Sequence, residues 1–161
     1  MYTIINVIRA LSTLIEANFP DYPVNDRDIE EGFDRPSYFI DIENTVAENV
    51  TQYLIRERCD LKLYFFAENN YHGFLALLQM RGQLLDLLRR PLPITNDEDK
   101  VVGHILFTDV AAEVYKADKA LECTLSSEWV QRRPEEETSG WNQELIQNLN
   151  MDLNKLNEED E

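Results

Sequence analysis

Cysteine and basic residues are scarce in this sequence. Cys59 and Cys123 are its two cysteines, and no spacing of cysteine and histidine fits a zinc site. So few cysteines predict a reduced protein without a disulfide framework, made inside a cell. Lysine and arginine total 15 against 31 aspartates and glutamates, which gives a formal net charge of −16. Such a chain repels phosphate backbones and anionic lipid, so we expect no stable nucleic-acid binding.

Glycine, proline and long apolar runs are scarce as well. Five glycines and six prolines interrupt 161 residues, of which 43% are hydrophobic, so we expect one folded domain rather than a low-complexity chain. No stretch approaches the about 18 uninterrupted apolar residues of a membrane span. The richest stretch, 74–88, is broken by glutamine, arginine and aspartate. The first residues lack the basic start and apolar core of a signal peptide, so we expect no membrane contact and no export.

Catalytic and metal-binding motifs are missing too. His72 and His104 are the two histidines, and the sequence has no Gly-x-Ser-x-Gly, no His-Glu-x-x-His and no glycine-rich loop after a strand. Two acidic clusters, at 26–31 and 96–99, lack the glycine and the terminal glutamate of a calcium loop, so we expect solvated loops there. The sequence therefore predicts no enzyme, no metal site and no cofactor.

Apolar periodicity predicts two helices. Apolar residues recur at three- and four-residue steps over about 2–18 and again over about 70–88. The dipeptide Phe19-Pro20 ends the first helix. Asn70 is a suitable N-cap for the second helix, and the run Arg89-Arg90-Pro91 is a suitable stop.

Alternation of apolar and polar residues predicts strands between and after these helices. One strand begins at Ser37 and ends within 44–49, and a longer one covers 53–65, where Glu57 on the apolar side marks a bulge or an edge position. A further strand is expected over 101–115. The chain then reverses at Asp118-Lys119 into a return strand over 121–129, whose odd-numbered residues face inward.

This order of elements predicts an α+β fold. We expect an antiparallel-rich mixed β-sheet packed against two helices, formed by a single domain over 1–133. Residues 134–161 contain nine acidic residues and one basic residue, so this acidic C-terminal tail holds half of the net charge. Apolar residues in the tail step by three and four, which predicts a partly helical or disordered segment that binds a partner through Trp141, Ile146, Leu149, Leu153 and Leu156.

Basic residues on the outward side of the strand over 53–65 form a candidate subunit interface. Arg56, Arg58 and Lys62 occupy every second or fourth position, and they face either an acidic surface of another subunit or carboxylates of neighbouring strands; both interpretations stay open. Trp129, Arg132 and Arg133 have the composition of an interface anchor, although a tryptophan on the inward side also fits the core.

Three short motifs after the first helix carry a family resemblance. They are Phe19-Pro20-Asp21-Tyr22, Ile29-Glu30-Glu31-Gly32-Phe33 and Pro36-Ser37-Tyr38-Phe39-Ile40-Asp41-Ile42. Together with the order of elements, they make residues 1–131 resemble the tail terminator (tail completion) proteins of long-tailed phages and prophages. The hairpin at Asp118-Lys119 lacks the glycine expected from that pattern, and the segment past Pro134 has no counterpart in it.

The resemblance implies a non-enzymatic structural protein of a phage or prophage virion. Subunits of that family are expected to form a ring, a hexamer, that caps the tail tube, ends its polymerisation and joins it to the head connector. The implied partners are copies of the chain itself, the tail tube protein and the head connector protein. The implied location is the virion tail, assembled in the cytoplasm of the bacterial host.

The resemblance also suggests a role for acidic residues. DNA must pass through such a ring without being held, so we expect Asp97, Glu98 and Asp99 to lie on a loop that faces the lumen or the tube. The alternative function is an acidic inhibitor that mimics nucleic acid and binds a DNA-handling enzyme. The carboxylates are spread over loops and tail rather than set at regular spacing, which favours the structural protein.

Overall fold

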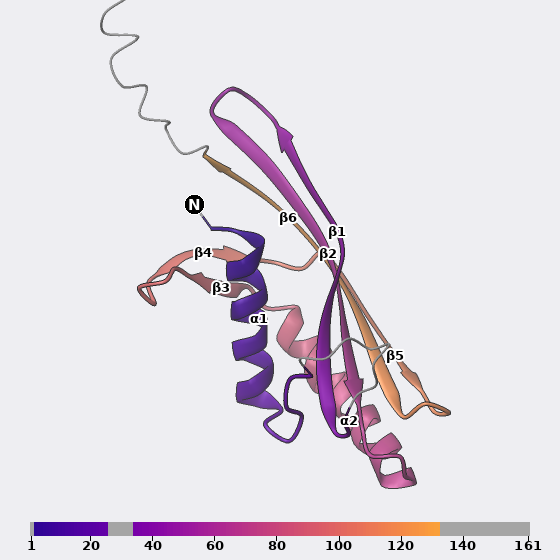
Figure 1. The fold of residues 1–161 in the computed structure, drawn as a ribbon. Coiled ribbons are helices and arrows are strands. Elements are labelled where there is room, and N and C mark those ends of the chain that lie inside the picture. The colour runs from indigo at the N-terminus through magenta and orange to yellow at the C-terminus, as the bar shows by residue number, and fades with distance from the viewer. Residues whose placement is uncertain (1, 26–33, 133–161) are drawn as a thin grey trace, which may run out of the picture.

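Two helices cover one face of a twisted four-stranded sheet (Figure 1). The computed structural model describes residues 2–25 and 34–132. The sheet is antiparallel throughout, with the strand order β1-β2-β6-β5, and β3 and β4 form a separate two-stranded sheet. The elements are α1 (Ile4–Asn18), β1 (Ser37–Asn49), β2 (Leu54–Phe66), α2 (Tyr71–Leu88), β3 (Leu92–Thr95), β4 (Val101–Ile105), β5 (Asp109–Tyr115) and β6 (Ala120–Arg132). The predicted α+β fold is confirmed.

Both helices are those that the apolar periodicity predicts. α1 buries Val7, Leu11 and Ile15 along one stripe. α2 begins at the predicted N-cap, where the Asn70 side chain accepts a hydrogen bond of 2.7 Å from the backbone N–H of Gly73. Both helices contribute to one hydrophobic core, so they lie on the same face of the sheet.

The inward side of the sheet follows the predicted alternation. Over 59–65 of β2 and 121–129 of β6 the odd-numbered residues are buried, and they include Cys59 and Cys123, both free thiols. Burial raises the pKa of Cys59 to about 11 and that of Cys123 to about 12. Apart from Phe66 and Ala120, which are buried, the even-numbered residues on the opposite side are half-buried or exposed, because among the described residues no helix covers that face.

The expected strand over 101–115 is wrong, because the chain leaves one sheet and enters another there. β4 pairs with β3, whereas β5 pairs with β6, and residues 106–108 connect them. In this connection Phe107 is buried and Leu106 is 52% exposed. Consecutive apolar residues at odd and even positions around 105–107 thus mark the connection between two strands, not the middle of one buried strand. The strand β3, which pairs with β4, was not predicted.

The first strand extends to the last residue of the segment 44–49, within which its end was expected. β1 continues to Asn49, which pairs with Ile55. Its second half looks like a loop in the sequence because it is exposed on both sides. The irregularity expected near Glu57 lies instead in β1, between Ile42 and Asn44, while Glu57 is paired in register with Ala47 and Trp129.

This extension forms a projecting arm. The pairing of β5 with β6 ends at Ser126, so only three strands continue beyond that point. We call residues 44–60 with 127–132 the arm; it comprises the second half of β1, the first half of β2 and the end of β6. Figure 1 shows the β1–β2 hairpin reaching past the N-terminal end of α1. Within residues 2–25 and 34–132, both sides of its tip are therefore exposed.

Candidate functional site

The basic residues predicted on β2 lie on the uncovered face of the sheet. Arg56 Nε is 3.3 Å from Glu128 Oε1, and Arg58 is 3.3 Å from Asp60 Oδ1. Lys62 Nζ is 2.7 Å from Glu43 Oε1 and 3.7 Å from Glu122 Oε1. Each predicted cation thus has a carboxylate partner on its own or a neighbouring strand. A contact with another subunit stays a prediction, and it would have to share or replace these ion pairs.

Local hydrogen bonds favour the ionised forms of two of these groups, Asp60 and Lys62. The Ser126 hydroxyl donates a hydrogen bond of 2.7 Å to Asp60, which together with Arg58 lowers the pKa of that carboxyl below its usual range. The Glu43 carboxylate raises the pKa of Lys62 by accepting its hydrogen bond. Because Arg56, Arg58 and Lys62 are each held by a carboxylate, this part of the face presents positive and negative charges side by side at fixed positions.

A shallow hollow lies among these residues at the arm. Its floor combines the two arginines with carboxylates and one apolar side chain, so it is close to neutral overall. Its lining residues are Asn44, Val46, Glu48, Arg56, Arg58 and Glu128. Val46 is 39% exposed, which leaves an apolar contact between charged neighbours.

The predicted interface anchor is divided between core and surface. Trp129 is 8% exposed and stacks on Tyr2 at 5.7 Å between ring centroids. Its Nε1 has no hydrogen-bond partner within the described parts of the chain. Trp129 is therefore a core residue of the single subunit, and its part in subunit contact stays a prediction. Arg132 is exposed at the end of β6, whereas Arg133 lies outside the described residues.

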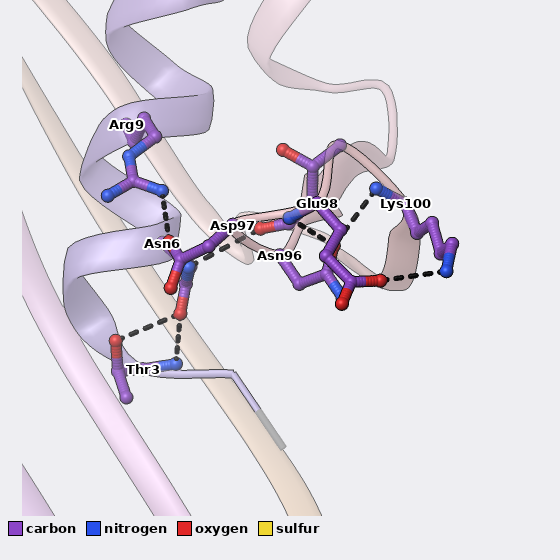
Figure 2. Close-up of polar contacts among 8 residues, drawn as sticks. Thr3, Asn6, Arg9, Asn96, Asp97, Glu98 and Lys100 are labelled. Carbon is purple, nitrogen blue, oxygen red and sulfur yellow. Dashed lines mark hydrogen bonds and ion pairs between the residues drawn. The ribbon is translucent and has the colours of Figure 1, made fainter.

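The predicted acidic loop connects β3 to β4 (Figure 2). Asn96 holds its shape, because the Asn96 side chain accepts hydrogen bonds of 3.0 Å from the N–H groups of Glu98 and Lys100. Asp97 lies 2.8 Å from Arg9 of α1, and Glu98 lies 2.7 Å from Lys100. Asp99 adopts a positive φ of 58° in the turn. The loop is thus anchored to α1, and two of its three carboxylates are paired with cations.

An aromatic corner on the uncovered face was missed. Tyr64 and Phe66 stack at 6.3 Å, and the Arg35 guanidinium lies 5.5 Å from the centre of the Phe66 ring. Beside them, the Tyr115 hydroxyl donates a hydrogen bond of 3.1 Å to the Glu113 carboxylate. Glu113 lies opposite Glu122 across the β5–β6 pair. The available signal was that Tyr64 and Phe66 share the outward side of β2 with the basic residues, where polar side chains are expected.

Several predicted residues lie outside the described ranges. They are the acidic cluster at 26–31 and the proposed partner-binding residues Trp141, Ile146, Leu149, Leu153 and Leu156. Over 2–25 and 34–132, no group of three or more histidine, cysteine, aspartate or glutamate side chains is arranged to hold a metal ion. Neither helix in those same ranges is long and apolar enough to cross a membrane.

Comparison with families of known proteins gives a match over most of the chain. The model of a family described as phage tail terminator protein matches residues 6–139. A search of curated proteins finds no match. The family match covers both sheets, the arm, the acidic loop, α2 and all of α1 except its first two residues, so it applies to nearly the whole described fold.

Proposed function

Since this chain belongs to the phage tail terminator proteins and is thus a structural component of a virion tail, we propose that it caps the tail tube as a ring. The ring, a hexamer, ends polymerisation of the tube and joins it to the head connector. It assembles in the cytoplasm of the bacterial host. The observation that carries the proposal is the family match over residues 6–139.

The surface of the described subunit supports a role in assembly. One face of the sheet is uncovered and patterned with charge, and the arm projects beyond the helices. A subunit with such a face can contact tube, connector and neighbouring subunits at the same time. We propose that it acts through these contacts, with no bond made or broken.

The acidic loop is proposed to face the lumen or the tube. Asp97, Glu98 and Asp99 lie together at the tip of the β3–β4 hairpin, away from the arm. Carboxylates at a lumen repel the DNA that passes, over about 10 Å at moderate salt. Arg9 and Lys100 pair with two of these three carboxylates, so the loop and its two cations together keep a net negative charge.

Deleting the gene for this chain from the phage that encodes it tests the proposal. We expect tails of irregular length without heads, and restoration of normal tails and infectivity when the intact chain is supplied in trans. A chain with Asp97→Lys, Glu98→Lys and Asp99→Lys is expected to restore infectivity poorly, because the reversed loop attracts DNA.

The matched control carries the same change of charge elsewhere. Asp21, Asp86 and Asp118 are exposed and lie outside the loop, so their combined replacement by lysine is expected to restore infectivity. Normal tails in the deletion strain would refute the terminator role itself. Full activity of the reversed loop would refute only its place at the lumen or the tube.

A further inference from the structure

The arm exposes two strand edges within the described residues. From Asn44 to Asn49, β1 pairs only with β2. On the other side, β6 loses β5 as a neighbour after Ser126 and then pairs only with β2. Unpaired N–H and C=O groups along such edges are ready to pair with a further strand. The arm can therefore extend its sheet in two directions.

The two edges run in compatible directions. β1 and β6 are both antiparallel to β2, so they are parallel to each other. If a copy of the chain is placed beside another by rotation, the β1 edge of one copy meets the β6 edge of the next in parallel. A contact between two different surfaces, repeated by rotation, is the type that closes a ring.

The side chains on these edges also match. On the uncovered face, β1 presents Asn44, Val46 and Glu48, and β6 presents Glu128, Val130 and Arg132. Placing Val46 beside Val130 of the next copy joins two exposed apolar side chains, which are 39% and 51% exposed. The same register brings Glu48 beside Arg132 of the next copy.

Glu48 and Arg132 are suited to such a contact. Neither makes an ion pair with any described residue, unlike the cations at 56, 58 and 62. Arg56 faces Glu48 across the β1–β2 pair, but its Nε is directed to Glu128. A shift of one residue would turn the valines to opposite faces, so the pairing register is well specified.

We propose that β1 of one copy pairs in parallel with β6 of the next, through Asn44–Glu48 and Glu128–Arg132, and that this contact links the subunits of the ring. The inference rests on the proposed function and names its subunit surface. Within one copy, Val46 and Glu128 both lie opposite Arg58 of β2. Pairing Val46 with Val130 of the next copy therefore offsets that copy by two residues along the strands. A stagger of this kind is what closed sheets of tilted strands require.

A disulfide trap tests this contact directly. In a chain with Val46→Cys and Val130→Cys, mild oxidation of the assembled protein is expected to give a ladder of covalent oligomers up to the full ring. A bond within one copy is excluded, because the two positions are separated by two strand spacings, about 10 Å. The native Cys59 and Cys123 are buried and should not react.

The matched control moves the second cysteine from β6 to the neighbouring strand β5, on the same face of the sheet. A chain with Val46→Cys and Glu113→Cys, which places the second thiol on β5, is expected to give no ladder. Separately, Glu48→Arg and Arg132→Glu are each expected to weaken assembly about tenfold, and the two combined are expected to recover it.

The outcomes separate this inference from the proposed function. If the parent chain forms rings but the Val46/Val130 ladder does not appear, or if the combined charge exchange fails to recover assembly, the edge pairing is overturned and the ring stands. A parent chain that stays monomeric beside its tube protein contradicts the ring and the edge pairing together.

Discussion

At the scale of single residues, the inward side of the sheet was predictable and the partners of its charges were not. Strict alternation placed Cys59 and Cys123 inside, where the structure has them. The ion pair of Arg56 with Glu128 joins residues far apart in sequence, and it depends on the register of β2 against β6. A single sequence does not determine how β2 and β6 are paired. It therefore does not decide whether the cations contact carboxylates of neighbouring strands or an acidic surface of another subunit.

The buried thiol of Cys123 makes stability depend on pH. Its pKa is raised to about 12, so the folded state holds a proton that the unfolded state releases above about pH 9. The contribution is fully present below pH 9 and is lost as pH rises toward 12. Between pH 8 and pH 10 the parent should lose about 1 kcal/mol more unfolding free energy than the Cys123→Ala variant.

Urea unfolding at the two pH values measures this difference. Val114→Ala is the control, because it removes apolar volume from the same core without removing a titrating group, and it should keep the pH dependence of the parent. Equal pH dependence of the parent and the Cys123→Ala variant would contradict the assigned burial of the thiol.

At the scale of elements, long periodic segments were predictable and changes of direction were not. The helices and the inward faces of β2 and β6 follow their apolar periods closely. The stretch 101–115 resembles one strand in the sequence but forms two. Residues before 106 belong to the sheet of β3 and β4, and residues after 108 belong to the sheet of β5 and β6. The extension of β1 over 44–49 resembles a loop in the sequence, because both of its faces are exposed and its residues carry no alternation of apolar and polar side chains.

Two glycines of α2 test how closely this helix is packed. Gly82 has open space around the position of a Cβ atom, so Gly82→Ala should stabilise the protein by about 1 kcal/mol through better helix propensity. A Cβ on Gly73 would collide with the backbone oxygen of Glu68, so Gly73→Ala should be destabilising by about 1 kcal/mol or more.

The two alanine variants are each other's control, because both remove a glycine from the same helix. Their unfolding free energies are measured by urea denaturation at neutral pH. Stabilisation by both substitutions would show that the first turn of α2 lies farther from residue 68 than the structure has it.

At the scale of the whole molecule, charge and shape point to assembly. The excess of acidic residues disfavours nucleic-acid binding, and the structure adds a projecting arm and an uncovered face with ordered charges. The family was recognisable from three motifs near the N-terminus, and the family match confirms it. The open edges of the arm could not be foreseen, because they depend on where β5 stops pairing with β6.

The most direct test of the proposed function follows tube growth in the presence of this chain. The purified chain is added to polymerising tail tube protein of the same phage, and tube lengths and ends are examined by electron microscopy. We predict that elongation stops and that each capped end carries a closed ring of this chain. Tubes that continue to lengthen, with ends that carry no additional density, would contradict the account.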